Sequence, residues 1–180
     1  MKLVKLFLFV LVALVVVVFI VAAVVPGTYD VDRTVIIEKP KTLVYDYVKY
    51  LKNQDNFSKW ANIDPGMKKD FRGKDGTVGF VSAWESDHKD VGKGEQEIIK
   101  IQEGSRIDYE LRFIAPWEST SPAFMSVDSI DSSQTIVTWG FHGEMPMPMN
   151  LMLLFMDMEE MLGNDLAEGL DRLKIVLEQE

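Results

Sequence analysis

The feature that most constrains this chain is an uninterrupted apolar run near its N-terminus. Residues 6–25, LFLFVLVALVVVVFIVAAVV, are twenty consecutive residues without a charged or hydrogen-bonding side chain. A helix rises about 1.5 Å per residue, so such a run spans about 30 Å, the thickness of the hydrocarbon core of a bilayer. The run therefore predicts one transmembrane helix that contacts the membrane through residues 6–25.

We interpret this run as a retained anchor rather than a cleaved signal peptide. The apolar region of a signal peptide has about 7–15 residues and is followed by small residues at the cleavage site, whereas residues 24–27, Val-Val-Pro-Gly, contain no Ala-x-Ala pattern. Lys2 and Lys5 precede the run, and the first charges after it are Asp30 and Asp32. Because basic residues favour the cytoplasmic side, this asymmetry predicts a single-pass protein of the cytoplasmic (inner) membrane with its domain outside the cytoplasm.

The rest of the chain is expected to form one acidic domain. Of the 19 basic and 28 acidic side chains, only Lys2 and Lys5 lie before residue 28, so the remaining 153 residues carry 17 basic and 28 acidic side chains and a net charge of −11. A segment of this length is a common single-domain size. The sequence therefore divides into an anchor, residues 1–27, and a domain, residues 28–180.

Charge and cysteine content exclude several classes of function. A strongly acidic domain repels the phosphate backbone, so we expect no nucleic-acid partner. The chain contains no Cys, which excludes thiol catalysis, Cys-based zinc sites and iron–sulfur clusters. No spacing of the His-Glu-x-x-His type occurs either, and we predict no metal and no cofactor.

The hydrophobic pattern of the domain predicts an α+β fold. Residues 28–39 alternate apolar and polar side chains up to Pro40, which is typical of a strand, and residues 41–51 have the spacing of a helix. From residue 67 to residue 145, short alternating runs separated by turn residues indicate about six more strands. Residues 150–177 carry one apolar stripe and predict a long C-terminal helix, whose stripe needs the concave face of the sheet as its partner. This order predicts a helix-grip fold, with a curved antiparallel sheet of about seven strands wrapped around the long helix.

Short motifs spread over residues 28–180 resemble a known group of proteins. They are Tyr29-Asp-Val-Asp-Arg33, Ser58-Lys-Trp60, Asp64-Pro-Gly-Met67, Gly92-Lys-Gly-Glu95, Phe113-Ile-Ala-Pro116, Thr138-Trp-Gly140, Met156-Asp-Met-Glu-Glu-Met-Leu-Gly163 and Gly169-Leu-Asp-Arg-Leu-Lys174. With them the domain resembles the polyketide cyclase/dehydrase and lipid-transport family of the START-like (SRPBCC) superfamily, especially its membrane-anchored bacterial members. One departure is Ser-Lys-Trp where relatives usually have Ser-Pro-Trp. The resemblance implies the helix-grip fold and a deep, mostly apolar cavity between the sheet and the long helix.

Aromatic and methionine side chains are the candidates for contacting a ligand in that cavity. Seven of the ten Met residues fall within residues 145–161, and flexible thioethers suit either a tolerant ligand gate or the filling of core gaps. The aromatic residues could line the cavity or simply pack the core. Gly163 and Gly169 interrupt the long helix, which indicates room for a ligand or a close approach of the sheet backbone. The predicted ligand-binding residues are Trp60, Phe80, Trp84, Phe113, Trp117, Trp139, Met145, Met149, Met152, Phe155, Met156 and Gly163.

Four residues are candidates for acid–base catalysis. Glu95 and Glu97 lie two apart on one predicted strand and therefore share a face, where a carboxylate pair in an apolar cavity could work with raised pKa values. Tyr109 and His142 are the others, although strand alternation places His142 opposite to Val137, Trp139 and Phe141 and so predicts that it faces outward. The irregular spacing of the isoleucines in residues 98–101 predicts a β-bulge.

The sequence as a whole favours a membrane-tethered, non-catalytic module that holds a hydrophobic small molecule or a lipid. One alternative is a cyclase or hydrolase that acts on a hydrophobic substrate in the same cavity, which requires at least two of the four candidate residues to converge inside it. A second alternative is an interaction protein whose acidic surface recruits a partner of unknown identity.

Overall fold

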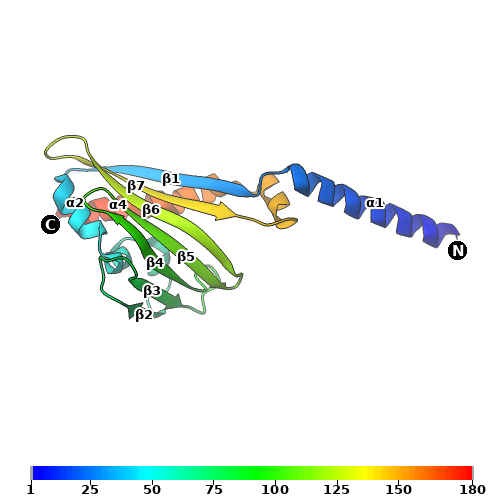
Figure 1. Ribbon diagram of the computed structural model, residues 1–180, viewed down its shortest axis with the longest axis horizontal. Coiled ribbons are helices and arrows are strands. Elements are labelled where there is room, and N and C mark those ends of the chain that lie inside the picture. The colour runs from blue at the N-terminus through cyan, green and yellow to red at the C-terminus, as the bar shows by residue number, and fades with distance from the viewer. Residues whose placement is uncertain (1, 180) are drawn as a thin grey trace.

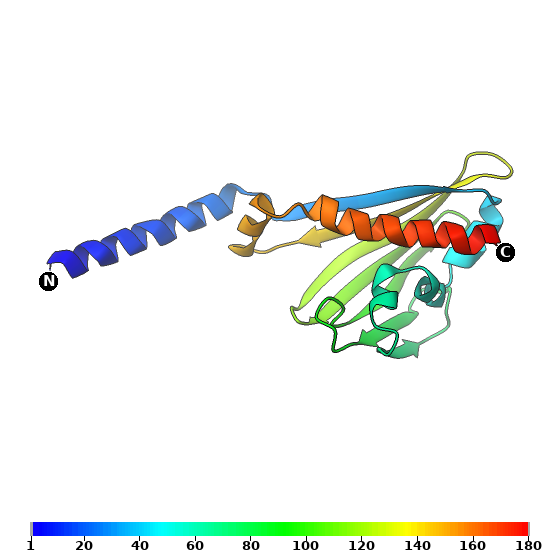
Figure 2. The same cartoon turned by 180° about the vertical axis from the view of Figure 1, so that it is seen from behind.

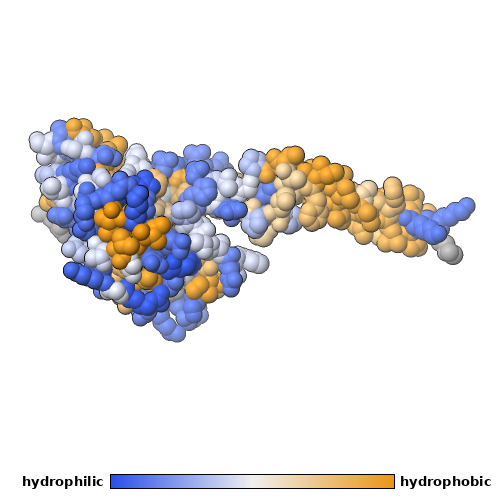
Figure 3. All heavy atoms as spheres, in the orientation of Figure 1, coloured by the Kyte–Doolittle hydropathy of each residue, from blue (hydrophilic) through white to orange (hydrophobic). Residues whose placement is uncertain are grey.

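A computed structural model describes residues 2–179 of the chain and contains one helix that projects away from a single folded domain (Figure 1). Helix α1 (Lys2–Val24) follows from the apolar run and is long and apolar enough to cross a membrane by length and composition. Nearly all of its side chains are exposed, and Figure 3 shows it as an apolar rod beside a largely polar domain.

The domain is built on one antiparallel sheet of seven strands in the order β1-β7-β6-β5-β4-β3-β2. The strands are β1 (Thr28–Ile37), β2 (Lys68–Arg72), β3 (Val81–Glu85), β4 (Lys93–Gln102), β5 (Arg106–Ala115), β6 (Ser119–Ser129) and β7 (Thr135–Glu144). The strand count and the helix-grip arrangement predicted from the sequence are confirmed. The register between β4 and β5 shifts between Ile98 and Lys100, so the predicted bulge is present.

Helices cover the concave face of the sheet (Figure 2). Helix α4 (Met158–Gln179) lies along β1 and β7, and its buried stripe packs on the inward residues of these strands. Helix α2 (Lys41–Val48), the 3-10 helix η1 (Leu51–Asn56) and helix α3 (Lys59–Ile63) cover the other side of that face. The core lies between these layers and includes Val31, Ile37, Val44, Ile107, Val137, Leu166, Leu170, Leu173 and Leu177.

The prediction that the long helix begins at residue 150 is wrong. Residues 149–154 form a separate 3-10 helix, η2 (Met149–Leu154), and α4 begins only at Met158. Asp157 Oδ1 accepts a hydrogen bond from the backbone N–H of Glu160 at 2.8 Å. A carboxylate at this position pairs with a free N–H of the first turn and favours a helix start there. The apolar stripe continues through residues 150–157 and therefore did not reveal this helix start.

Candidate functional site

A cavity of about 230 Å³ lies between the concave face of the sheet and the helices that cover it. Its floor comes from alternate, inward-facing residues of the strands, namely Ser82, Trp84, Gln96, Leu111, Phe113, Ala123, Trp139 and Phe141. Its roof comes from the helical segments, namely Leu51, Gln54, Ser58, Trp60, Ala61, Leu162 and Leu166. The lining is therefore mostly apolar, and strand alternation explains which sheet residues reach it.

Aromatic rings packed edge to face form the walls of the cavity. The ring of Trp139 contacts Phe57 and Trp60 with centroids 5.7 and 6.2 Å apart, both in T-shaped arrangements. Trp84 and Phe113 make a third such pair at 6.2 Å. The indole N–H of Trp84 also donates to the backbone carbonyl of Val91 at 3.2 Å. Because these rings support one another, the cavity has preformed walls.

Two buried polar groups beside the apolar core have no hydrogen-bond partner among the described residues. Gln54 Nε2 and the Tyr109 hydroxyl are both buried without a hydrogen bond of normal geometry, and the two side chains lie close together. Burial raises the pKa of the Tyr109 phenol far above its ordinary value, and the neighbouring Gln54 amide lowers it only in part. Other atoms of the Gln54 side chain line the cavity, where its amide is a potential polar contact for a bound molecule.

Four of the twelve residues predicted to bind a ligand line the cavity: Trp60, Trp84, Phe113 and Trp139. Phe80 is buried in the core and stacks on Phe71. Trp117 lies in the connection between β5 and β6 with 74% of its surface exposed, outside the cavity.

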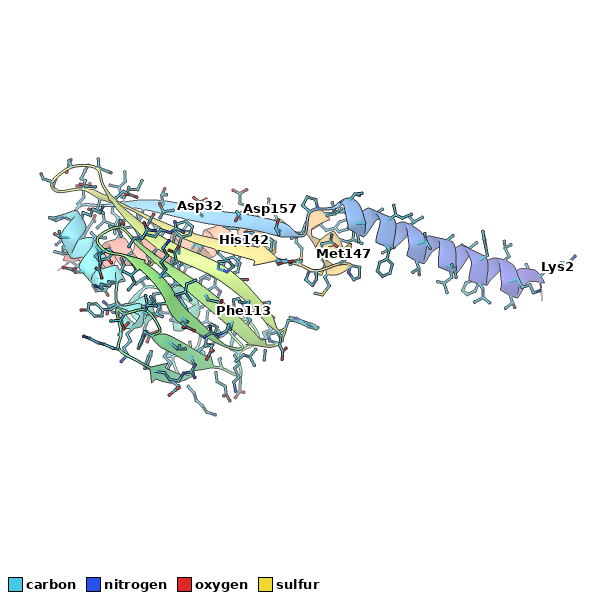
Figure 4. All side chains as sticks on the ribbon, viewed as in Figure 1. Lys2, Asp32, Phe113, His142, Met147 and Asp157 are labelled. Atoms are coloured by element: carbon cyan, nitrogen blue, oxygen red, sulfur yellow. The ribbon has the colours of Figure 1, made fainter. Side chains whose placement is uncertain are left out.

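The methionine-rich residues lie elsewhere. Residues 145–156, which we call the neck segment, connect β7 to the start of α4 beside the C-terminal end of α1 (Figures 1 and 4). Met145, Met149, Met152, Phe155 and Met156 all belong to this segment and none of them lines the cavity. Phe155 and Met156 instead line a second, more open hollow with Val25 and Pro26, which follow α1. The structure thus separates the methionine cluster from the cavity that it was expected to gate.

The helix glycines accommodate side chains of the sheet. A Cβ at Gly163 would collide with the guanidinium group of Arg33, whose Nη2 donates to the carbonyl of Glu159 at 3.0 Å. A Cβ at Gly169 would collide with the ring of Trp139. The space at each glycine is therefore filled by a side chain, and neither a ligand nor the sheet backbone occupies it.

Glu95 and Glu97 share a face as predicted, but that face is the outer one. Arg112 lies between them, with Nε 2.7 Å from Glu95 Oε1 and Nη1 2.8 Å from Glu97 Oε2, and it also contacts Glu110. Hydrogen bonding from Arg72, and then from Arg112, lowers the pKa of Glu95 below its ordinary value of 4.5. A lowered pKa favours an ion pair over a carboxyl group poised for acid–base catalysis at neutral pH.

His142 also faces outward, as strand alternation predicted, with its Nδ1 2.7 Å from Asp30 Oδ1 (Figure 4). Of the four catalytic candidates only Tyr109 points inward, so the convergence that the enzyme hypothesis required is absent among them. Within residues 2–179 no group of three His, Asp or Glu side chains is arranged to hold a metal ion.

Several cavity residues escaped the sequence analysis. Ser82, Gln96 and Leu111 alternate with outward residues, so strand periodicity could have found them. Gln54 and Ser58 lie in and beside a short 3-10 helix, where no periodic pattern marks the side chains that reach the cavity.

Solved structures with very different sequences share this fold. A norcoclaurine synthase from Thalictrum flavum, in complex with dopamine and hydroxybenzaldehyde, matches with a TM-score of 0.60 and 11% identity over 89% of this chain and 93% of its own. The Aha1 dimer from Colwellia psychrerythraea matches with a TM-score of 0.56 and 15% identity over 83% and 96%. A protein from Thermobifida fusca matches with a TM-score of 0.58 and 18% identity over 83% and 93%.

No family model matches the chain, and no curated protein does. At such low identities the likeness shows the fold alone, a curved antiparallel sheet that wraps around a long C-terminal helix. The resemblance to the START-like (SRPBCC) superfamily, and within it to membrane-anchored bacterial members of the polyketide cyclase/dehydrase and lipid-transport family, stays a prediction.

Proposed function

We propose that this protein is a membrane-tethered binding protein that holds a small hydrophobic molecule, or part of a lipid, between its sheet and its helices. The observation that carries the proposal is the mostly apolar cavity of about 230 Å³ whose aromatic walls are already in place. Binding in such a cavity is driven by the apolar area removed from water, about 25 cal/mol per Å². Preformed walls add to affinity because little has to be ordered when the ligand enters.

The size of the cavity limits the ligand. The cavity has a volume of about 230 Å³. It is smaller than the 300–1,000 Å³ typical of pockets for drug-sized ligands. The proposed occupant is therefore a small hydrophobe or a section of one acyl chain, and a whole two-chain phospholipid would require the helices to move apart.

A single polar contact is proposed to orient the ligand. The Gln54 side chain lines the cavity, and its amide can hydrogen-bond to an oxygen atom of the ligand, such as a carbonyl or hydroxyl. Because a polar group in an apolar wall gains from a hydrogen-bond partner, a ligand with one acceptor oxygen is favoured over a pure hydrocarbon.

Binding is proposed in preference to catalysis because Glu95, Glu97 and His142 lie on the outer face of the sheet. An enzyme in the same cavity would have to rely on residues other than these.

The tether is proposed to be residues 1–27, with the binding domain formed by residues 28–180. Helix α1 supports this by its length and apolarity. Lys2 and Lys5 before the span favour a cytoplasmic N-terminus and a domain on the outside of the inner membrane.

The test begins with the full chain purified from its native host in lipid nanodiscs. Organic extraction followed by mass spectrometry should release a hydrophobe in a fixed ratio to protein. Three of the four tryptophans, Trp60, Trp84 and Trp139, line the cavity, so intrinsic fluorescence reports binding when a panel of fatty acids and small aromatic ketones is added.

A variant with a plugged cavity tests where the ligand binds, and the same substitution on the outer face of the sheet is its control. Ala61 lines the cavity at α3, whereas Ala83 lies on the outer face of β3. Ala61→Trp should abolish the ligand-dependent change in fluorescence, and Ala83→Trp should leave it intact. Absence of any extracted hydrophobe, together with a flat response of the wild-type chain to the whole panel, would overturn the proposal.

A further inference from the structure

The neck segment is an exposed apolar surface of the domain. Residues 145–156, MPMPMNLMLLFM, contain no charged side chain. Met147, Leu154 and Phe155 are 58%, 56% and 88% exposed. Large apolar side chains gathered on one short segment are uncommon on a surface that faces only water and indicate an interaction site.

This surface is attached to the end of the predicted membrane span. Asn150 is 2% exposed, and its Nδ2 group donates to the carbonyl oxygens of Ala22 at 2.7 Å and Val25 at 2.9 Å. Ala22 belongs to the last turn of α1 and Val25 directly follows that helix, so no later helical N–H group donates to these carbonyls. The backbone N–H of Met145 also donates to Gly27 at 2.7 Å. The neck segment is therefore held against the anchor, and Figure 4 shows Met147 at this junction.

The position of this attachment places the neck segment at the edge of the bilayer. Helix α1 has 23 residues, and a helix of that length measures about 35 Å, slightly more than the hydrocarbon core of about 30 Å. The last turn, where Asn150 binds, then lies at the boundary between acyl chains and headgroups. Apolar residues that lie in the plane of the membrane are buried about 5–10 Å into that boundary.

We propose that the neck segment is a second membrane contact, which inserts Met147, Leu154, Phe155 and their apolar neighbours among the lipids beside α1. The proposal rests on the tether described above. Its consequence is that the domain is held in one orientation on the bilayer, rather than swinging on the short Pro26-Gly27 connection.

The charges around the segment specify the kind of lipid surface. Glu144 and Asp157 flank it, and Glu159 follows at the start of α4. Basic residues are what draws a segment to anionic lipids, and none lies within the neck segment. The contact should therefore form equally well on zwitterionic phosphatidylcholine and gain nothing from anionic lipid.

The absence of Cys from the chain allows a direct test by depth-dependent quenching. Single cysteines are introduced by Met147→Cys and Phe155→Cys and labelled with an environment-sensitive fluorophore. The full chain is then reconstituted in phosphatidylcholine nanodiscs whose acyl chains are brominated either near the headgroup or near the chain end. Val15→Cys, in the middle of α1, reports the span itself. Ser132→Cys, in the β6–β7 turn at the opposite end of the domain, is the control for a water-exposed position.

We expect labels at positions 147 and 155 to lose more emission with lipid brominated near the headgroup than with lipid brominated near the chain end. The label at position 15 should show the reverse order, and the label at position 132 should lose none. Adding phosphatidylserine should not increase the loss at 147 or 155.

Three results would overturn the inference in distinguishable ways. Quenching at position 15 without quenching at 147 and 155 would remove the second contact and leave the tether. No quenching at position 15 would remove the tether and the second contact together. An emission change at 147 that grows with protein density and is insensitive to bromine would show a second copy of the chain on this surface, and would also overturn the lipid contact.

Discussion

The indole ring of Trp139 occupies the space in which Gly169 would otherwise carry a side chain: a Cβ built on Gly169 would lie 2.8 Å from Cζ3 of Trp139. The same ring is held between Phe57 and Trp60 and forms part of the cavity wall. The packing of α4 and the shape of the cavity therefore depend on each other at Gly169. Any group added at this glycine must displace the Trp139 ring, which has little freedom to move.

Gly169→Ala should destabilise the domain. Overpacking in a filled core costs about 1–3 kcal/mol, while the better helix propensity of Ala returns about 1 kcal/mol. The net expectation is a loss of up to about 2 kcal/mol in urea unfolding, with a shift of tryptophan emission as Trp139 moves. Unchanged stability and emission would contradict the coupling.

Gly163→Ala serves as the matched comparison on the same helix. Here the obstructing group is the flexible, partly exposed end of Arg33, which can swing into solvent. Its ion pair with Glu159 is exposed and worth little, so the gain in helix propensity should offset the loss of that pair. Urea unfolding should show a change within about 1 kcal/mol of wild type. A loss as large as that of Gly169→Ala would mean that Arg33 is held more firmly than its exposure indicates.

Gln54→Leu should separate ligand affinity from stability. Because Gln54 Nε2 lies beside the Tyr109 hydroxyl without a hydrogen bond of normal geometry, its removal should change the unfolding free energy by no more than about 1 kcal/mol. A ligand with an acceptor oxygen should bind about three- to tenfold more weakly, which corresponds to a net hydrogen bond of about 0.5–1.5 kcal/mol. The matched hydrocarbon without that oxygen should bind the two chains equally in fluorescence titrations. Equal losses for both ligands would remove Gln54 as the polar contact.

Glu95 should contribute stability that depends on pH. The folded state lowers the pKa of Glu95 below 4.5, chiefly through Arg72, so its contribution is fully present above pH 4.5 and is lost as the pH falls through the folded pKa. Glu95→Gln should therefore be less stable than wild type at neutral pH, and the difference should shrink in acid. Urea unfolding of both chains across this range measures it, and a difference that is constant with pH would argue against the ion pair.

Asn150→Ala should loosen the attachment of the domain to α1 without unfolding the domain. The variant loses both hydrogen bonds to the end of α1. Spin labels introduced by Val17→Cys and Thr34→Cys should give a narrow distance distribution in the otherwise unaltered chain and a broader one in the Asn150→Ala background. Asn164→Ala, an exposed change on α4, is the control and should leave the distribution narrow. Equal widths in all three would show that Asn150 does not set the orientation.

Much of this architecture follows from local patterns in the chain. The apolar run of residues 6–25 determines α1, because it contains no residue that breaks a helix. Alternation in β7 correctly placed Trp139 inward and His142 outward, because successive side chains of a strand point to opposite faces whatever the strand packs against. Even the bulge in β4 was visible as a break in that alternation.

Only the tertiary structure decided which groups pack against the helix glycines and against the methionine cluster. The sequence marked Gly163 and Gly169 as unusual, but that Arg33 and Trp139 fill their space depends on how a strand far away in the chain packs against the helix. Likewise, the methionines were visible as a cluster, yet their place beside α1 depends on Asn150 reaching residues 125 and 128 positions earlier in the chain. Periodicity reports the faces of one element, whereas the partner of each face is set by long-range packing, which no local pattern encodes.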